Sequence, residues 1–351
     1  MKGKDFATIK DIAQALGISP STVSRALRDL PDVNPATRHK VLEMARDIHY
    51  QRNHFAAGLV SNRSYLIGVV VPQIANYFFS TVISGIQEIA WQHQYRVIIC
   101  ESKHEPAREE LDLQALVSMR VDGILIAPLQ EREGPEDAAY IRRLIEQETP
   151  VVCFDRQRDE LMCPVVLMDD YKAAFDATAY LIKTGCRRIG HLGADPVLQV
   201  ARLRRAGYEA ALRQYGLPVR EAWIRQTGFK AETARRDANS LMSGAERPDA
   251  LLCINDLVAI GATSEIKSMG LRVPDDVSII GFYDSPVASL MDPPLTMVHQ
   301  PALEMGHAAM NLLLSEMKAA ARPHEAWQDI KQGHLVIRHS TRPEVMAYAA
   351  G

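Results

Sequence analysis

The sequence of 351 residues lacks the short motifs that mark the common enzyme classes. It contains no Walker A lysine motif, no dinucleotide-binding GxGxxG, no GxSxG nucleophile turn and no HExxH zinc motif. Its eleven histidines occur singly, without the spacing of metal ligands, and His191 and His299 lie in apolar runs typical of a buried core. These absences predict a protein that is not an enzyme and that carries no cofactor and no metal.

Cysteine pairs and long hydrophobic runs are also missing. The five cysteines are an odd number without a CxxC, so buried free thiols in a reducing cytoplasm are the favoured interpretation. No signal peptide precedes the first expected helix. The stretch 64–87 is uncharged, but Pro72, Gln73 and Asn76 interrupt it, which favours a strand, a turn and a helix over a membrane span. We therefore expect a cytoplasmic protein.

Charge is distributed unevenly although the net charge is only −3. Residues 1–63 contain ten Lys or Arg and six Asp or Glu, a net +4, which leaves −7 for the remaining chain. A basic N-terminal segment on an acidic body is typical of a nucleic-acid-binding module joined to a domain that does not bind nucleic acid.

The basic segment predicts three helices between residues 8 and 50. Thr8 is a good N-cap for a first helix to Leu16, and Gly17 suits the tight exit from it. Ser19-Pro20 and Asn34-Pro35 each combine an N-cap with a proline at the first helical position. Apolar residues at helical spacing predict one small core, formed by Ile9, Ile12, Ala13, Leu16, Val23, Ala26, Leu27, Val41, Leu42, Ala45 and Ile48.

The second of these helices carries short hydroxyl side chains and one arginine on its polar face: Ser21, Thr22, Ser24 and Arg25. Such a face can come close to a DNA major groove and donate hydrogen bonds to phosphates and base edges. Periodicity alone also allows a generic three-helix bundle with a solvated polar face.

The residue pattern distinguishes between these interpretations. TIKDIAQALGIS-x-STVSRAL, followed by TR-x-KV, resembles the helix-turn-helix headpiece of the lactose-repressor (LacI/GalR) family of bacterial regulators. We expect Arg25, Ser21 and Pro20 to read bases, Arg25 by a bidentate contact to guanine, with a phosphate contact as its alternative. The resemblance implies phosphate contacts at Thr8, Ser19, Thr22, Ser24, Asn34 and Tyr50.

Residues 51–64 match the family's hinge helix, which pairs with its partner's copy on DNA. Asn53, Ala56 and Leu59 occupy the matching places, and Arg52 stands where proline is usual. The resemblance implies that Asn53 contacts DNA and that Leu59 enters the minor groove and wedges a base step open. The alternative is an ordinary linker.

From residue 65 onward, buried-type strands alternate with helix-length segments, which predicts parallel sheets covered on both faces. We expect two doubly wound α/β subdomains of periplasmic-binding-protein type with a ligand between them, as the resemblance also implies. The effector and dimerisation domain is expected at 65–342, its first subdomain at 65–164 and 297–326, its second at 165–296 and 327–342, and a tail at 343–351. Strands are predicted at 66–71, 96–100, 123–127, 151–154, 165–168, 188–192, 250–254 and 277–281.

The effector site is predicted from strand ends and from the resemblance. Phe78 and Phe79 begin the helix after the first strand, although simple core packing is equally compatible with both rings. Asp155-Arg156 and Asn255 follow buried strands, and Asp256 either joins them or only caps a helix. Arg204 matches the family's R-x-x-G-aromatic arginine, with Arg202 and Arg205 as competing neighbours.

The pattern departs from the family at residues 281–284. The family usually has Gly, an aromatic residue and then a ligand-binding Asp, whereas this chain has Gly-Phe-Tyr-Asp. Tyr283 and Asp284 are both candidate effector residues. A sugar or sugar derivative is the first choice of effector, with a purine or a sugar acid still open.

These observations predict a homodimeric transcriptional regulator, acting as a repressor on a pseudo-palindromic DNA operator. A solute-binding transport component with the same core fold is the alternative, and the headpiece argues against it.

Overall fold

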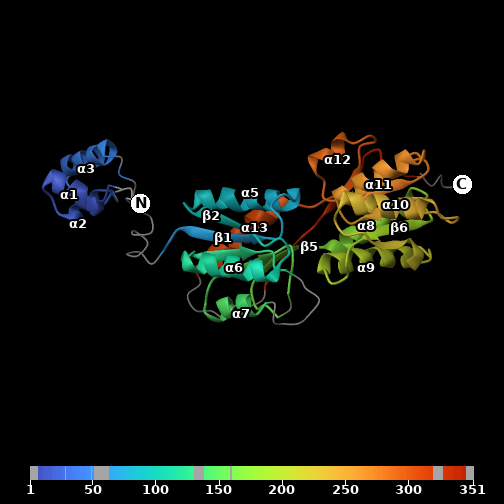
Figure 1. The fold of residues 1–351 in the computed structure, drawn as a ribbon, viewed down its shortest axis with the longest axis horizontal. Helices are drawn as coiled ribbons and strands as arrows, with labels where there is room; N and C mark the ends of the chain where they lie inside the picture. Colours follow the sequence, from blue (N-terminus) through green and yellow to red (C-terminus); the bar gives the residue numbers. More distant parts are fainter. Residues whose placement is uncertain are drawn as a thin grey trace, which may run out of the picture. The chain divides into compact units, whose positions relative to one another are not determined.

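The computed structural model describes residues 7–27, 29–48, 50, 63–129, 138–158, 160–318 and 327–344. The chain divides into two compact units, Met1–Ser64 and Tyr65–Gly351. Both are drawn in Figure 1. Among the described residues, no helix has the length and the apolar composition required to cross a membrane.

The first unit is a three-helix domain made of α1 (Ile9–Leu16), α2 (Pro20–Leu27) and α3 (Pro35–Asp47). Gly17 ends α1 in the left-handed conformation at φ 62°. Five side chains form the buried core: Ile12, Ala13, Val23, Ala26 and Val41.

One predicted core residue is wrong. Leu42 is 40% exposed, because it lies next to Val41 on α3 and adjacent helical residues point in directions about 100° apart. Leu27, Ala45 and Ile48 pack partly buried against the core, as expected.

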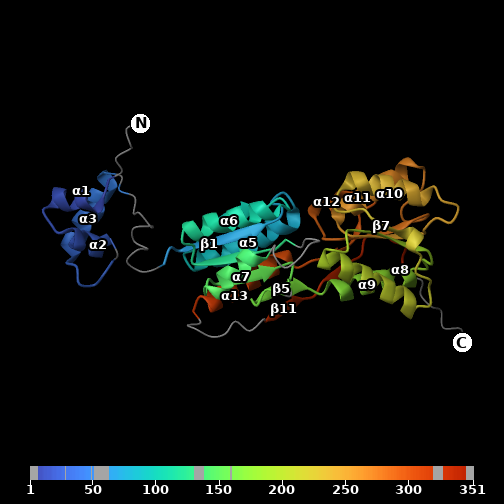
Figure 2. The ribbon, with the colours of Figure 1, turned by 60° about the horizontal axis from the view of Figure 1, so that its bottom comes forward.

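The second unit contains two lobes, each a six-stranded sheet between layers of helices (Figures 1 and 2). The first lobe has the strand order β11-β5-β4-β3-β1-β2, and all its pairs are parallel. Helices α5 (Tyr77–Gln92) and α13 (Ala302–Glu316) cover one face, and α6 (Pro106–Ser118) and α7 (Ala139–Glu146) cover the other. The strands are β1 (Leu66–Val71), β2 (Arg96–Glu101), β3 (Gly123–Ile126), β4 (Val151–Phe154), β5 (Val165–Met168) and β11 (Gln328–Lys331).

The second lobe has the order β12-β10-β9-β8-β6-β7, in which only β12 is antiparallel to its neighbour. Helices α8 (Asp170–Lys183) and α9 (Gln199–Gln214) pack on one face, and α10 (Ala231–Met242) and α11 (Asp256–Ser268) pack on the other. The strands are β6 (Ile189–Gly193), β7 (Ile224–Gln226), β8 (Ala250–Cys253), β9 (Ser278–Phe282), β10 (Thr296–His299) and β12 (His334–Val336). A short helix, α12 (Pro286–Leu290), follows β9.

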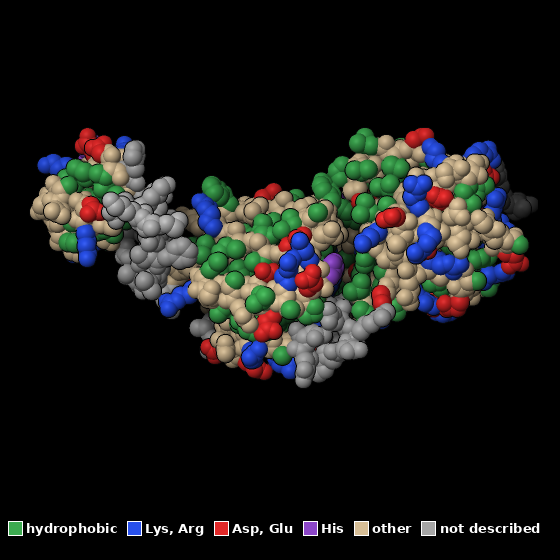
Figure 3. Space-filling view, in the orientation of Figure 1, with side chains coloured by type: hydrophobic (Ala, Val, Ile, Leu, Met, Phe, Trp, Pro, Cys, Tyr) green, Lys and Arg blue, Asp and Glu red, His purple; other side chains and the backbone are tan. Residues whose placement is uncertain are grey.

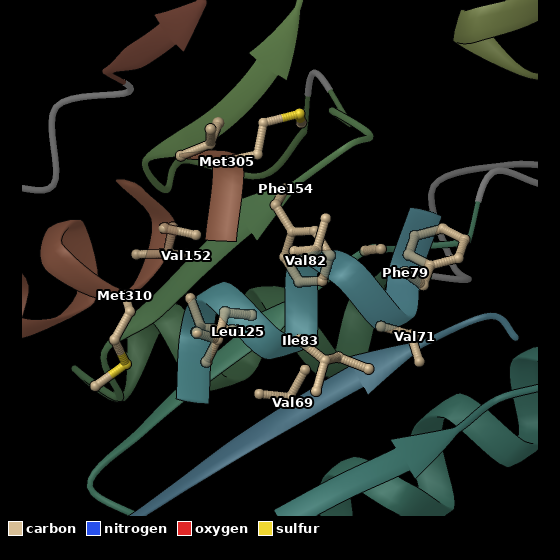
Figure 4. Packing of buried hydrophobic residues seen from close by; sticks show 14 of the residues in the cluster. Val69, Val71, Phe79, Val82, Ile83, Leu125, Val152, Phe154, Met305 and Met310 are labelled. Carbon is tan, nitrogen blue, oxygen red and sulfur yellow. The ribbon is translucent and has the colours of Figure 1, made fainter. Parts of the chain in front are cut away.

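Continuous apolar strands explain this architecture. Val69 and Val71 of β1, Leu125 of β3 and Val152 and Phe154 of β4 all point into the core under α5, where Figure 4 shows them packed together. The same strands place residues of opposite parity into a second core under α6 and α7. A strand that is buried on both faces must be apolar throughout, which is the pattern that predicted a parallel sheet.

The subdomain limits require a correction. Both β5 and β11 pair within the first sheet, so the chain crosses between lobes near residues 169, 300 and 332 rather than near 164, 296 and 326. Strand β5 is short and apolar like its neighbours, so nothing in its composition shows which sheet it joins. Its pairing with β4 and β11 in the structure places β5 in the first sheet.

Candidate functional site

The N-terminus of α1 is held by a capping box. The Thr8 amide and hydroxyl both donate to the Asp11 carboxylate, at 2.6 and 2.8 Å. These hydrogen bonds lower the pKa of Asp11, the side-chain bond most of all. Thr8 is exposed, so its position at the helix start is compatible with the predicted phosphate contact.

The N-terminus of α2 gathers the predicted DNA-contacting hydroxyls. The Ser19 oxygen accepts from the Thr22 amide at 3.1 Å and lies 2.7 and 2.8 Å from the hydroxyls of Ser21 and Thr22. Ser19, Pro20 and Ser21 are exposed, and Thr22 and Ser24 are half-buried. A helix N-terminus with its amides directed outward favours a phosphate oxygen.

Arg25 leaves the last turn of α2 with half of its side chain exposed. Its Nη1 donates to Asp32 at 2.7 Å, and both partners are about half-exposed. An exposed ion pair of this kind contributes little stability, so the guanidinium can exchange Asp32 for a base edge or a phosphate.

The remaining predicted DNA contacts divide into two groups. The Asn34 side chain accepts from the Ala36 amide at 2.8 Å and caps α3, and Tyr50 packs against the headpiece core. Asn53 and Leu59 of the predicted hinge helix lie outside the described residues.

A cavity lies between the two lobes of the second unit, where the carboxyl ends of the parallel strands meet. It contains about 660 Å³ of empty space, part of it open to solvent. In Figure 3 acidic and basic side chains are interspersed over the visible face of the second lobe, so this face has no broad field of one sign. The cavity is lined by Gln73, Asn76, Phe78, Phe79, His104, Asp155, Arg156, Val200, Arg204, Phe229, Asn255, Asp256, Tyr283 and Gln300.

Asp155 and Arg156 form the charged wall of the cavity on the first lobe. Asp155 directly follows β4 and has a positive φ of 63°, at the point where the chain leaves the strand and lines the cavity. Burial raises the pKa of the Asp155 carboxyl to about 6, and the nearby Arg156 guanidinium opposes that rise. Arg156 Nε lies 3.4 Å from Oδ2 of the Asp155 carboxylate.

Arg156 is buried but incompletely bonded. It is 5% exposed, and its Nε and Nη1 have no hydrogen-bond partner among the described residues. Its guanidinium carbon lies 6.0 Å from the ring centre of Phe79. A buried cation with unused donors at a cavity wall can hold an acceptor such as a hydroxyl, carbonyl or carboxylate oxygen.

Arg204 reaches the cavity from α9 in a different bonding state. Its Nε and Nη2 lie 2.8 and 2.7 Å from one Asp170 oxygen, its Nη1 donates to the Ile254 carbonyl, and its guanidinium stacks 3.9 Å from the Phe282 ring centre. Arg202 and Arg205 do not line the cavity, since the first donates to nearby carbonyls and the second pairs with glutamates.

Asn255 and Asp256 begin α11 at the cavity wall. The Asn255 oxygen caps the helix by accepting from the Val258 amide at 2.9 Å, and its nitrogen donates to the Phe229 carbonyl at 3.3 Å. Asp256 lines the cavity as well, and burial raises the pKa of its carboxyl.

Asp284, the other candidate effector residue at this position, lies outside the interlobe cavity and lines a second cavity beside it. Its carboxylate accepts two hydrogen bonds from Arg338, at 2.6 and 2.8 Å. Tyr283 does line the cavity, because its φ of 68° turns the side chain back between the lobes.

Sequence reasoning did not find six of the lining residues: Gln73, Asn76, His104, Val200, Phe229 and Gln300. Three lie within three residues of a strand end: Gln73 after β1, His104 after β2 and Gln300 after β10. Gln73 and His104 follow predicted strands, so strand position could have indicated them, whereas Gln300 follows β10, which was not predicted.

The lining combines aromatic rings with amides, carboxylates and guanidinium groups, which suits recognition of a small polar ligand. Within the part of the chain that the structure describes, no group of three or more His, Cys, Asp or Glu side chains is placed to hold a metal.

Comparison with known proteins identifies the family of this chain. The family model described as bacterial regulatory proteins, lacI family, matches residues 8–53, and a periplasmic binding protein-like domain matches residues 178–341. The HTH-type transcriptional repressor CytR of Escherichia coli (strain K12) is 35% identical over 344 residues, covering 97% of this chain and 98% of that protein. The chain belongs to the lacI family of bacterial regulatory proteins.

Solved structures of the same family share the fold. A lac repressor dimer bound to operator and the anti-inducer ONPF matches 97% of this chain and 100% of its own, with a TM-score of 0.86 and 25% identity. A LacI family transcriptional regulator from Enterococcus faecium with bound ribose matches 79% of this chain and 99% of its own, with a TM-score of 0.69 and 25% identity.

Membership of the lacI family makes this chain a DNA-binding transcriptional regulator with an effector domain of periplasmic-binding-protein type. The predicted family and fold class are confirmed, and the relatives are regulators rather than enzymes, as expected.

Proposed function

We propose that this lacI-family regulator is a cytoplasmic homodimeric repressor that binds a pseudo-palindromic operator and responds to a small sugar or sugar derivative. The single observation that carries the proposal is the joining of a helix-turn-helix unit to a second unit with a polar and aromatic cavity between two lobes. The lac repressor dimer on operator and the E. faecium regulator with ribose support the same assignment.

On the DNA side, α2 enters the major groove. Arg25, Ser21 and Pro20 contact bases, and Thr8, Ser19, Thr22, Ser24, Asn34 and Tyr50 contact phosphates. Exposure of Arg25 and the outward hydroxyls at the start of α2 support this division of roles. Asn53 and Leu59 contribute minor-groove contacts by resemblance to the family's hinge.

Replacing Arg25 tests base reading. Against a duplex selected from a random pool by the full chain, Arg25→Ala should lose roughly 5- to 150-fold in preference over an unrelated duplex, because one good base contact is worth about 1–3 kcal/mol. Weak, salt-dependent binding to both duplexes should persist. Competition binding at two salt concentrations measures both effects.

The matched control is Lys40→Ala, which removes one exposed positive charge from α3 and leaves α2 intact. It should weaken binding to both duplexes equally or leave it unchanged. If Arg25→Ala kept the selected duplex's preference, Arg25 would be a phosphate contact only.

On the effector side, Phe78, Phe79 and Tyr283 supply the aromatic surfaces, and Asp155, Arg156, Arg204 and Asn255 surround them with polar groups. Arg156 is the proposed main donor because its Nη1 has no hydrogen-bond partner among the described residues and its Nε has only the 3.4 Å ion pair with Asp155. Arg204 acts mainly by shaping the wall, since Asp170 and the Ile254 carbonyl occupy three of its nitrogens.

A thermal-shift screen of the full chain against pentoses, hexoses, nucleosides, purines and sugar acids tests this site. A true effector at 100 times its Kd stabilises the protein by about 2.7 kcal/mol. Arg156→Gln should remove the shift at the same concentration, whereas Arg202→Gln, a change on the exposed side of α9, should retain it. A panel without any stabilising compound, or a hit that Arg156→Gln leaves unchanged, would contradict the proposed site.

A further inference from the structure

The Tyr283 side chain connects the two lobes directly. It follows β9 of the second lobe, and its hydroxyl lies 3.0 Å from the Thr81 hydroxyl and 3.3 Å from the Tyr77 carbonyl, both on α5 of the first lobe. Its ring packs edge-on against Phe78 at 5.7 Å and tilted against Tyr77 at 5.7 Å. Tyr283 is 7% exposed and belongs to the hydrophobic cluster of the first lobe, although it follows a strand of the second.

The donors and acceptors at this contact form one chain. Thr81 donates its hydroxyl hydrogen to the Tyr77 carbonyl at 2.8 Å, so its oxygen is available to accept from Tyr283. Burial raises the pKa of the Tyr283 phenol, which therefore stays a donor. The contact is thus a directed hydrogen bond from the second lobe to the first.

The backbone of Tyr283 is held in an unfavourable conformation to make this contact. A φ of 68° is uncommon for a bulky residue such as tyrosine. Backbone strain of this kind persists only where the surrounding structure holds the residue in place. The residue after it, Asp284, is fixed by two hydrogen bonds to Arg338. The second lobe therefore presents Tyr283 on a rigid base.

Tyr283 also separates two cavities. It lines the interlobe cavity, and it lines a second cavity with Tyr77, Thr81, His299 and Pro301 beside the crossover at residue 300. The rim on the Arg156 side has its own interlobe contact, in which the Gln157 amide donates to the Gln199 side chain at 3.2 Å.

We propose that Tyr283 is an interlobe latch that holds the cleft closed through Thr81 and α5 without help from a ligand. This proposal rests on the proposed effector site, for which Tyr283 is a positioning residue. Its contact with α5 sets the separation of the two lobes and the position of the cavity wall that both lobes share. When the latch parts, the lobes open at both rims, and the two cavities become continuous.

Hydrogen exchange of the full chain, with no small molecule added, tests the latch. Tyr283→Phe keeps the ring and removes the hydroxyl, so exchange should rise by roughly two- to tenfold, the range for one lost net hydrogen bond. The rise should occur at two places: residues 77–82 beside the latch, and residues 155–158 with 197–200 at the Gln157–Gln199 rim, which Tyr283 does not touch.

Two variants make the test specific. Thr81→Val removes the nearer of the two acceptors and should give a smaller rise at the same places, since the Tyr77 carbonyl at 3.3 Å can still accept from Tyr283. The double variant should match Tyr283→Phe alone, because that change already removes the whole interaction. Tyr208→Phe removes a buried phenol hydrogen bond to the Ile189 carbonyl inside the second lobe, at 2.7 Å, and should leave both rims unchanged.

A rise at the first site alone would show a purely local contact and would overturn the latch, as would no rise or additive effects of the two variants. Because no ligand is present, this outcome is separate from failure of the proposed effector site, which the thermal-shift screen detects.

Discussion

Asp155 and Arg156, directly after β4, combine two buried charges with a backbone conformation of positive φ at Asp155. The positive φ at Asp155 directs two consecutive charged side chains toward the cavity, where burial disfavours the ionised carboxylate. Arg156 only partly offsets this cost, since the groups are 3.4 Å apart and the guanidinium keeps unused donors. The site is therefore prepared for a ligand at some cost to stability.

The raised pKa of Asp155, about 6, predicts a pH dependence of stability. The folded state binds this proton more tightly than the unfolded chain does, so the contribution of Asp155 is fully present below pH 4 and is lost as the pH rises through 6. Between pH 4 and 7 the free energy of unfolding of the wild type should fall by roughly 2–3 kcal/mol relative to Asp155→Asn.

Urea unfolding at several pH values measures this difference, and asparagine tolerates the positive φ at this position. Tryptophan fluorescence follows the second unit, since Trp91, Trp223 and Trp327 all lie there. The exposed Asp176→Asn serves as control. A constant difference between wild type and Asp155→Asn would show that the Asp155 carboxyl titrates normally.

Local sequence located most of the cavity but could not separate Tyr283 from Asp284. Both follow β9, and only the backbone conformation at Tyr283 decides which side chain faces the other lobe. Arg338, which binds Asp284, is 54 residues away in the sequence. A residue-scale role that depends on a distant partner cannot be read from the motif.

At the scale of elements, the contact between α5 and α13 depends on two glycines. A Cβ atom at Gly306 would meet the Val82 carbonyl oxygen, and one at Gly85 would meet the Leu303 carbonyl oxygen. Both clashes are with backbone, which cannot move aside like a flexible side chain. Since α5 carries Phe78, Phe79 and Thr81, this packing also places the first-lobe wall of the cavity and the partner of Tyr283.

Gly306→Ala should therefore destabilise the second unit by about 1–3 kcal/mol, although alanine favours a helix over glycine by up to about 1 kcal/mol. Urea unfolding measured by tryptophan fluorescence gives the change. Gly244→Ala is the matched control, because its Cβ would meet only the Leu241 carbonyl at an ordinary 3.5 Å. Equal stability of the two variants would mean that α5 and α13 separate without cost.

Strand prediction succeeded where periodicity and burial agreed and failed where strands were short or mixed. The eight predicted strands match β1–β6, β8 and β9 within one or two residues. Strands β7, β10, β11 and β12 were missed: each has only three or four residues, and β11 contains Gln328, Asp329 and Lys331. Strands β7, β11 and β12 lie at sheet edges, which tolerate polar residues, so their composition does not mark them. Strand β10 lies inside its sheet between β12 and β9, so edge position does not explain why it was missed.

At the scale of the whole molecule, the two units differ greatly in the size of their cores. The headpiece buries five hydrophobic side chains in one cluster. Each lobe of the second unit instead has an extensive apolar cluster on each face of its sheet. A core of five residues supplies only a few kcal/mol. The regulator should therefore unfold in two separate transitions, with the headpiece the less stable.

Ile12→Ala tests this independence. Ile12 is fully buried in the headpiece, and its truncation should cost about 2–5 kcal/mol, enough to unfold that unit. DNA binding should then be lost, while the tryptophan-detected transition and the ligand-induced thermal shift of the second unit stay unchanged, because all three tryptophans belong to it. Leu42→Ala removes an exposed side chain from the same unit and should retain DNA binding. A shifted tryptophan transition in Ile12→Ala would instead demonstrate that the headpiece stabilises the effector domain.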